Sequence, residues 1–374
     1  MLAIIAIIPP ITPILPILPM PSTSIMATLT YSQCTPEFLS LMTSRGMQGV
    51  RINSAHVTGS QMADMCSAIR STAPTAVILT DTKGAEVRTT DAPIPVEFLE
   101  GDTTVALYAP DRITTREAIY LNAPDLGRYL RPGQLMTIDD GALRFTIEAI
   151  EENTDEQYTG SVDRTRLRLR AINSGILGPR KSVNFPGIDL PHLPSVTEKD
   201  REAILAAPAA GVNIIAHSFV RTAADVEAVR EVLRSATDDN SYPSDILVYA
   251  KIECRMALDH LDEIMDAADG ILFARGDLGA AVPIEQIPVI QQQVMERATR
   301  RGLPVILSTQ ILQSMLSSDT PTRAEVTDMY LGVIQGASWM LLCGETAQGN
   351  YPAECIDIMR RTIDATTTYL LPRD

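Results

Sequence analysis

The chain of 374 residues is too long for one ordinary domain, but it would fit a barrel with an inserted domain. Its hydrophobic content of 45% is enough for a sizeable core. A net charge of −15 and the lack of a basic stripe argue against nucleic acid as the main partner. The five cysteines include no close C-x-x-C pair, which indicates reduced thiols and a cytoplasmic protein, and the four scattered histidines make a His-rich metal site unexpected.

Residues 1–23 form an apolar, proline-rich leader. The leader carries no Lys or Arg, so it lacks the charged start of a signal peptide. Its prolines would break a membrane-spanning helix. We therefore expect a disordered or loosely packed segment, or a translation start placed too early, and no membrane partner.

Short apolar runs then alternate with amphipathic stretches along most of the chain. The amphipathic stretches include Pro36–Arg45, Thr222–Ser235 and Ile284–Arg301, and the capping pattern at Thr222–Asp225 and Thr322–Glu325 indicates two helix starts. The apolar runs are typical of strands buried on both faces. Eight such runs are Ser24–Leu29, Gly49–Asn53, Ala76–Thr80, Val212–His217, Leu247–Glu253, Gly270–Ala274, Pro304–Ser308 and Trp339–Cys343. Eight strands alternating with helices predict an α/β fold, a closed (β/α)8 TIM barrel.

The alternation stops between residues 90 and 186. This interval has short alternating runs and turn signals at Arg131–Gly133 and Asp139–Gly141, which are typical of antiparallel strands. We predict a small inserted β-barrel domain between strand 3 and helix 3, so that the TIM barrel comprises residues 24–89 and 187–374. An insertion at this point leaves from the C-terminal face, where the active site of a barrel lies, and is placed to act as a lid.

Charged and polar residues stand at the ends of the predicted strands. In the fifth strand Tyr249, Lys251 and Glu253 alternate, so their side chains share one face, which can point into the barrel mouth. Asp277 follows the sixth strand. The other strand ends carry Arg51, Asn53, Asp81, Lys83, Ser218, Thr309 and Glu345. One such residue means little, but a ring of them predicts a site.

Glu253 and Asp277 supply hard oxygen ligands from adjacent strand ends. With few histidines and no thiolate cluster, such a pair suits Mg²⁺ or Mn²⁺ with bound water and substrate oxygens. Lys251 beside them adds a positive charge that can stabilise an enolate or a transferring phosphoryl group, and Arg51 could grip phosphate from the opposite wall. The structural alternative is a salt-bridge network that joins the two carboxylates to Lys251 and Arg275.

The chain resembles the pyruvate kinase family over roughly residues 25–362. The matching stretches are GMQGVRINSAH (46–56), TDTKGAEVRT (80–89), SFVRTAADV (218–226), AKIE (250–253), DGILFARGDLG (269–279), STQIL (308–312), TPTRAEVTD (320–328) and CGETAQGNYPAE (343–354). IDDGAL and GPRKSVNFPGIDLPHLPSVTEKD also match in and after the insert. The resemblance implies a (β/α)8 barrel interrupted by a β-domain lid.

The resemblance also implies an activity, in which phosphoenolpyruvate and ADP give pyruvate and ATP. In that activity Arg51 would contact the transferring phosphate, and Lys251 would stabilise the phosphoryl group and the enolate. Thr309 would bind substrate and assist proton delivery to the enolate. Arg88 matches an arginine on the phosphate side.

By the same resemblance, Glu253 and Asp277 would hold Mg²⁺ (or Mn²⁺), which also binds the substrate carboxylate and enolate oxygen. Backbone N–H groups at Gly276 and Asp277 would bind the substrate carboxylate. The cation ligands and the carboxylate site would thus lie on neighbouring strand ends.

A second cofactor implied by the resemblance is K⁺. Asn53, Asp81 and Thr82 match the monovalent-cation ligands, and Glu86 stands where potassium-dependent members carry glutamate. The family pattern has a serine ligand where this chain has Ala55. We therefore expect stimulation by K⁺ with weakened affinity.

Two alternatives stay open beside a pyruvate kinase-like phosphotransferase. One is Mg²⁺-dependent enolate chemistry without ADP transfer, as in oxaloacetate decarboxylation, and the other is a non-catalytic paralogue. The sequence stops soon after the eighth barrel helix, without the C-terminal regulatory domain of the family. We therefore expect no activation through such a domain, and a homodimer through the barrel in preference to a tetramer.

Overall fold

The computed structural model describes residues 23–84, 86–139, 141–153, 163–188, 190–236 and 246–371. The leader predicted over residues 1–23 lies outside the described residues except for Thr23, whose buried hydroxyl donates to the Ala337 carbonyl. Among the described residues, no helix has the length and apolar character needed to cross a bilayer. All five cysteines fall in described segments and are free thiols.

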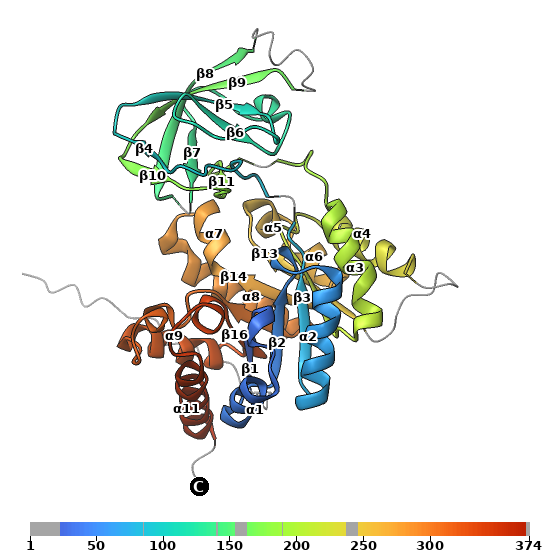
Figure 1. Ribbon diagram of the computed structural model, residues 1–374. Coiled ribbons are helices and arrows are strands. Elements are labelled where there is room, and N and C mark those ends of the chain that lie inside the picture. The colour runs from blue at the N-terminus through green and yellow to red at the C-terminus, as the bar shows by residue number, and fades with distance from the viewer. Residues whose placement is uncertain are drawn as a thin grey trace, which may run out of the picture.

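Eight parallel strands close into a barrel in the order β1-β16-β15-β14-β13-β12-β3-β2 (Figure 1). They are β1 (Ser24–Thr28), β2 (Gly49–Asn53), β3 (Val77–Asp81), β12 (Ile214–His217), β13 (Leu247–Ile252), β14 (Gly270–Ala274), β15 (Val305–Ser308) and β16 (Trp339–Leu342). Each coincides with one of the eight predicted runs to within one or two residues at either end. The predicted TIM barrel is therefore confirmed.

Helices surround the barrel (Figure 1). They are α1 (Pro36–Arg45), α2 (Gly59–Thr72), α3 (Glu198–Ala210), α4 (Ala223–Arg234), α5 (Arg255–Asp259), α6 (Leu261–Ala267), α7 (Arg275–Ala281), α8 (Ile287–Arg301), α9 (Arg323–Ile334), α10 (Gly344–Ala347) and α11 (Pro352–Leu370). The predicted capping boxes at Thr222 and Thr322 are both formed. The stretch predicted as one helix over Ile284–Arg301 is a short 3-10 turn, η5 (Ile284–Gln286), followed by α8, with Pro288 in the first turn of α8.

Successive residues of each barrel strand enter two different cores. Side chains such as Val50 and Ile215 pack outward against the helices, whereas Leu79 and Tyr249 fill the barrel interior. This alternation follows from the two-residue period of a strand. At Gly270, the register partner of Tyr249, a Cβ atom would lie 2.4 Å from the tyrosine ring, so the interior layer requires glycine there.

The segment between β3 and α3 forms the predicted β-domain, which stands above the carboxyl ends of the barrel strands (Figure 1). Its six-stranded half-barrel has the order β11-β7-β8-β9-β5-β6, and β10 pairs with β4. The strands are β4 (Val96–Phe98), β5 (Thr103–Tyr108), β6 (Ala118–Leu121), β7 (Leu135–Ile138), β8 (Leu143–Glu152), β9 (Thr165–Ala171), β10 (Gly175–Leu177) and β11 (Val183–Asn184). Phe98 and Phe145 meet edge to face in its separate core.

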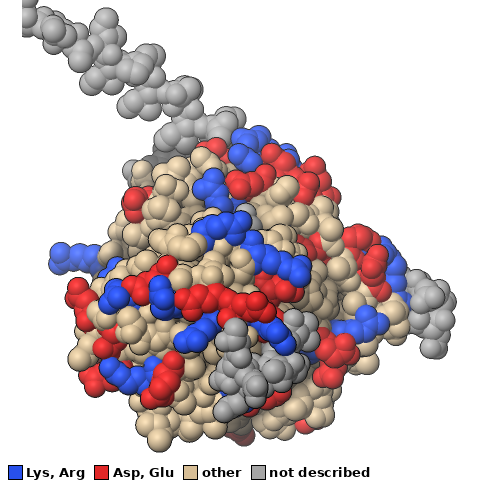
Figure 2. Space-filling model, turned by 90° about the horizontal axis from the view of Figure 1, so that it is seen from above, with Lys and Arg blue, Asp and Glu red and all other residues tan. Residues whose placement is uncertain are grey.

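Isolated bridges join Arg88 to Ser182 and Thr89 to Leu121, so the chain pairs with the insert from residue 88 onward. The exact domain limits, and the role of the insert as a lid, stay predictions. On the face seen from above, Lys and Arg side chains are interspersed with Asp and Glu (Figure 2). This mixture agrees with the argument from composition against a nucleic-acid surface.

Candidate active site at the barrel mouth

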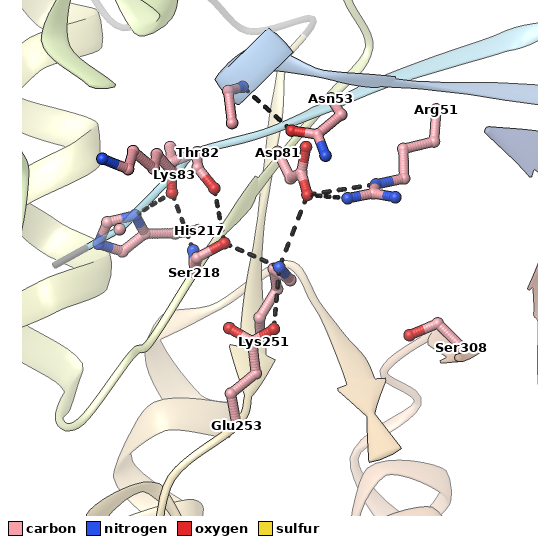
Figure 3. Close-up of polar contacts among 12 residues, drawn as sticks. Arg51, Asn53, Asp81, Thr82, Lys83, His217, Ser218, Lys251, Glu253 and Ser308 are labelled. Atoms are coloured by element: carbon pink, nitrogen blue, oxygen red, sulfur yellow. Dashed lines mark hydrogen bonds and ion pairs between the residues drawn. The ribbon is translucent and has the colours of Figure 1, made fainter. Parts of the chain in front are cut away.

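Lys251 lies on the inner side of β13, buried with 9% of its surface exposed (Figure 3). Its ammonium group donates to Ser218 Oγ at 2.8 Å and lies 2.9 Å from Glu253 Oε1 and 3.6 Å from Asp81 Oδ2. Three oxygens thus surround a group with three N–H donors. Burial lowers the pKa of Lys251, but the Glu253 and Asp81 carboxylates outweigh that effect and raise it, so the lysine is charged.

Arg51 extends from β2 toward the Asp81 carboxylate, which also pairs with Lys251. Its Nε and Nη2 atoms lie 3.2 and 2.5 Å from Asp81 Oδ2, and its Nη1 donates to Thr28 Oγ1 at 3.1 Å. Burial raises the pKa of Asp81, but the charges of Arg51 and Lys251 more than offset this and lower it. Asp81 Oδ1, although buried, has no hydrogen-bond partner among the described residues. One lone-pair-bearing oxygen therefore remains available beside two cations.

Glu253 follows the end of β13 and is 2% exposed. Its Oε2 accepts from the Phe219 backbone N–H at 2.9 Å, whereas its Oε1 forms an ion pair with Lys251 that lacks hydrogen-bond angles. Burial raises the pKa of Glu253, Lys251 opposes the rise and Asp277 adds to it. Asp277, in the first turn of α7, is therefore near enough to Glu253 for their charges to interact, and their binding of one common ion stays a prediction.

Arg275 belongs to a different cluster. Its Nη1 donates to both carboxylate oxygens of Asp328 on α9, at 2.7 and 2.6 Å, and its Nε and Nη2 donate to the Thr309 carbonyl at 3.2 and 2.8 Å. Lys251 and Glu253 thus form an ion pair of the predicted network, whereas Arg275 binds groups on α9 and in the loop after β15.

Thr309 adopts a left-handed conformation, with φ of 68°. Its hydroxyl donates to the Ser308 carbonyl at 2.7 Å and accepts from the Gly276 backbone N–H at 2.8 Å. The resemblance predicts that the Gly276 N–H binds the substrate carboxylate and that Thr309 assists proton delivery. In the structure these two groups are hydrogen-bonded to each other.

The side chains of the three residues predicted to bind K⁺ do not all point to one place. Asn53 and Asp81 are register partners on β2 and β3, and Asn53 Oδ1 accepts from the Ala55 backbone N–H at 3.0 Å. The Thr82 hydroxyl, in contrast, lies 3.0 Å from His217 Nδ1 and accepts from the Ser218 N–H at 2.9 Å (Figure 3). Asp81 Oδ1 is the buried oxygen of this group that lacks a protein partner among the described residues.

Arg88 lies at the base of the insert and is only partly buried. Its Nε donates to Glu86 Oε2 at 2.6 Å and its Nη1 to the Arg180 carbonyl at 2.8 Å. Burial raises the pKa of Glu86, and Arg88 opposes that rise. Glu86 also lines a cavity of about 110 Å³ together with Glu253 and Phe219, so this carboxylate connects the insert to the barrel mouth.

Two further residues of the predicted ring, Glu345 and Lys83, take part in hydrogen bonds with the backbone. Glu345 is buried and accepts from the backbone N–H groups of Leu312 at 3.1 Å and Cys343 at 2.8 Å. Its inclusion among the mouth residues was therefore wrong. The backbone N–H of Lys83 donates to Asp200, a helix cap that the sequence assigned no role, although the T-x-x-D spacing from Thr197 signalled it.

Sequence reasoning also missed two members of the cluster. Ser218 was recognised as a strand-end residue without a role, yet it accepts a hydrogen bond from the Lys251 ammonium. The sequence places His217 in an apolar strand and predicts no role for it, whereas in the structure it is the buried partner of Thr82. The available signal was a histidine directly after the apolar residues Ile214–Ala216, within the same strand.

Among the described residues, no group of three or more His, Cys, Asp or Glu side chains is placed to enclose a metal ion. Glu253 and Asp277 would supply at most part of a coordination shell. This limited set fits Mg²⁺ or Mn²⁺, which keep water molecules and substrate oxygens as ligands. The buried Glu253 Oε1, which makes no hydrogen bond among the described residues, is an oxygen suited to such an ion.

A family model described as pyruvate kinase, barrel domain, matches residues 20–356. The chain belongs to the pyruvate kinase family. The pyruvate kinase of Borreliella burgdorferi is 34% identical over 337 residues, which cover 90% of this chain and 66% of that relative. The pyruvate kinase of Geobacillus stearothermophilus is 34% identical over 356 residues, covering 94% and 58%. That of Methylorubrum extorquens is 35% identical over 343 residues, covering 91% and 67%. The chain therefore spans about two thirds of the length of these pyruvate kinases, or less.

Proposed function

We propose that this chain transfers the phosphoryl group of phosphoenolpyruvate to ADP, giving pyruvate and ATP. The observation that carries the proposal is the buried Lys251 ammonium, held between Asp81 and Glu253 beside Arg51. Phosphoryl transfer depends on positioning and charge neutralisation more than on covalent help from the protein. Two cations held by carboxylates inside a barrel mouth supply both requirements, and membership of the pyruvate kinase family supports the same reaction.

Glu253 and Asp277 would hold Mg²⁺ (or Mn²⁺). When bound, the metal supplies positive charge that stabilises the substrate carboxylate and the enolate oxygen. Burial keeps water away from Glu253, so its Oε1, which is paired with the Lys251 ammonium, would bind the ion without first losing a hydration shell.

Arg51 and Lys251 would bind the transferring phosphoryl group from two walls of the mouth, and Arg88 would approach from the insert. Both barrel cations are already oriented by Asp81, so little reorganisation is needed when phosphate arrives. Lys251 would then stabilise the enolate that remains after the phosphoryl group has left.

Thr309 would assist delivery of a proton to the enolate carbon. A substrate carboxylate that binds the N–H groups of Gly276 and Asp277 would compete with the Thr309 hydroxyl, which now accepts from the Gly276 N–H. Binding would remove the Gly276 donor, and the hydroxyl would then have only its donation to the Ser308 carbonyl to give up in order to turn toward the substrate. The same hydrogen bond would link recognition of the carboxylate to protonation.

A K⁺ ion near Asn53, Asp81 and Thr82 would complete the charge balance. Asp81 Oδ1 supplies a buried oxygen without another partner among the described residues, and Thr82 would contribute its carbonyl because its hydroxyl faces His217. Glu86 adds negative charge nearby. The missing hydroxyl at Ala55 would be replaced by water, at some cost in affinity.

The deciding experiment is a coupled assay of the purified protein with phosphoenolpyruvate, ADP, Mg²⁺ and K⁺, in which we expect pyruvate and ATP to form together. Omitting ADP and then substituting oxaloacetate separates phosphotransfer from enolate chemistry without a nucleotide. Pyruvate formed from oxaloacetate alone, with no ATP from phosphoenolpyruvate, would favour the decarboxylase-like alternative. No turnover in either arm would favour a non-catalytic paralogue.

We further propose a cytoplasmic location and a homodimer formed through the barrel. The free state of the five cysteines supports the first proposal. The exposed apolar side chains of Ile284 and Val289 near the start of α8 support the second. Light scattering of the purified protein measures the assembly directly.

A further inference from the structure

His217 occupies a position where the alternation of β12 calls for an apolar side chain. Ile215, two residues earlier on the same outward side, packs in the core between barrel and helices. His217 is 0% exposed in that layer. The charged groups that act on it are Asp200 of α3, Asp225 of α4, and the cations Lys251 and Arg221. A polar ring in such a layer must find hydrogen bonds or destabilise the fold.

Both ring nitrogens of His217 have hydroxyl neighbours. Nδ1 lies 3.0 Å from Thr82 Oγ1, and Nε2 lies 3.4 Å from Ser195 Oγ. The ring is fully buried and has a hydroxyl, not a carboxylate, at each nitrogen, which favours its neutral form. The Ser195 hydroxyl also forms a hydrogen bond with the Asp225 carboxylate, which can only accept, so Ser195 Oγ accepts from Nε2–H. Thr82 Oγ1, which accepts from the Ser218 N–H, then donates its own proton to Nδ1, and the ring is the Nε2–H tautomer.

The hydrogen bonds then run in one direction from the inner side of the barrel to the outer layer. The Lys251 ammonium donates to Ser218 Oγ at 2.8 Å, and the Ser218 hydroxyl donates to the Thr82 carbonyl at 2.6 Å. The Ser218 N–H donates to Thr82 Oγ1 at 2.9 Å, and the Thr82 hydroxyl donates to His217 (Figure 3). His217 in turn donates from Nε2 toward the Ser195 hydroxyl. The ring therefore joins the network that holds the lysine to the segment before α3.

We propose that His217 is a positioning residue, whose Nδ1 acceptor fixes the Thr82 hydroxyl and thereby the Ser218 acceptor of Lys251. The inference deepens the proposed phosphotransfer and rests on it. Thr82 also adjoins Asp81, the second oxygen partner of the lysine, so its orientation affects two of the three groups around the ammonium. A change on the outer face of β12 would thus reach the reacting groups through hydrogen bonds, without any contact between His217 and substrate.

Substitutions at residue 217 separate positioning from packing. His217→Asn places an amide oxygen near the position of Nδ1 and keeps an acceptor for Thr82, whereas His217→Gln places its amide near Nε2 and serves Ser195. We expect kcat of His217→Gln to fall about 10- to 100-fold, because small misplacement of a catalytic group has effects of this size. His217→Asn should recover most of the loss. KM for phosphoenolpyruvate should change by less than about threefold in both variants, since ground-state contacts are kept.

Two control variants distinguish an effect on packing from an effect that passes through Thr82. Ile215→Val removes a methylene from the same outer layer and should lower the thermal midpoint without changing kcat. Thr82→Val removes the hydroxyl that passes the effect onward. If His217 acts through Thr82, the Thr82→Val and His217→Gln double variant should be no slower than Thr82→Val alone.

The tautomer of the His217 ring can be measured independently of turnover. In protein labelled with ¹⁵N-histidine, long-range ¹H–¹⁵N spectra at pH 7 should show one histidine as a neutral Nε2–H tautomer, and its signal should vanish in His217→Asn. An Nδ1–H tautomer or a charged ring would overturn the inference. So would equal kcat values for the Gln and Asn variants in an active enzyme. If wild-type protein makes no ATP while the tautomer is as expected, the proposed function fails and the hydrogen-bond assignment stands.

Discussion

The ends of β13 and β14 look alike in sequence but differ in the structure. Each strand is a short apolar run followed by a cation and a carboxylate, Lys251 with Glu253 and Arg275 with Asp277. Lys251 points into the barrel and forms ion pairs across the mouth, whereas Arg275 points to α9 and binds Asp328. One strand end gathers reactive groups, and the other anchors a helix and a loop.

The difference comes from where each cation lies relative to the end of its strand. Lys251 is still within β13, two residues after Tyr249, and shares its inner side. Arg275 is the first residue of α7, just beyond the end of β14, and its side chain binds Asp328 on α9. Charge at the end of an apolar run therefore does not decide by itself whether a residue belongs to the site.

The largest effect should follow from Lys251→Met. We expect phosphoryl transfer to fall by at least about 10³-fold, because the group that neutralises the developing charge is lost. The thermal midpoint should change little, since Glu253, whose pKa burial raises to about 7, can take up a proton when the ammonium is lost, and Arg51 still pairs with Asp81. A coupled assay and a thermal melt of the same sample measure both quantities. Near-normal turnover would leave only a structural role for this lysine.

Arg275→Met should show the opposite pattern. The substitution leaves Asp328 and the Thr309 carbonyl without their donor, and we expect a loss of about 2–4 kcal/mol in the free energy of unfolding. Turnover measured well below the melting temperature should fall far less than in Lys251→Met. Urea unfolding gives the stability, with Asp328→Asn as the matched control. A variant that melts normally but is inactive would remove the contrast between the two strand ends.

Glu345→Gln tests the same distinction on the far side of the barrel. The carboxylate accepts from two backbone N–H groups, and an amide can satisfy only one of them with its oxygen. We expect about 1–2 kcal/mol of destabilisation. KM for phosphoenolpyruvate should be unchanged in steady-state kinetics, and a marked rise would return Glu345 to the site.

The smallest effect concerns the cation expected near β2 and β3. Ala55→Ser restores a hydroxyl that the family pattern has, and we expect the K⁺ concentration for half-maximal activity to fall several-fold, by about 1 kcal/mol of added binding. Titrating both proteins with K⁺ at fixed Mg²⁺ gives the comparison. Full activity of the wild type in K⁺-free buffer would show that Asn53 and Asp81 hold no required cation.

Much of this organisation could be predicted from the sequence. The eight apolar runs, the interruption after β3 and the inward placement of Lys251 follow from local periodicity, which requires no knowledge of distant contacts. Periodicity does not decide where Arg275 points, because this residue lies beyond the end of β14, in α7. Its actual partner, Asp328, lies 53 residues away on another helix, so only the folded chain reveals it.

The remaining misses have a common physical cause. Glu345 binds backbone N–H groups, and a sequence does not show which backbone groups a carboxylate will meet. His217 replaces an apolar side chain in a buried layer, and whether such a ring is tolerated depends on hydroxyls brought by β3 and by the segment before α3. Local patterns predict where side chains point, but not which distant polar groups will meet them.

Crystals grown or soaked with Mn²⁺ and phosphoenolpyruvate test the central claim most directly, because anomalous scattering locates the metal independently of activity. We predict a peak between the Glu253 and Asp277 carboxylates, about 2.2 Å from an oxygen of each, with Lys251 beside it. A peak on only one of these carboxylates would leave the ligand pair unproven. A fully occupied metal elsewhere in the barrel mouth, with Glu253 still bound only to Lys251 and the Phe219 N–H, would contradict the account.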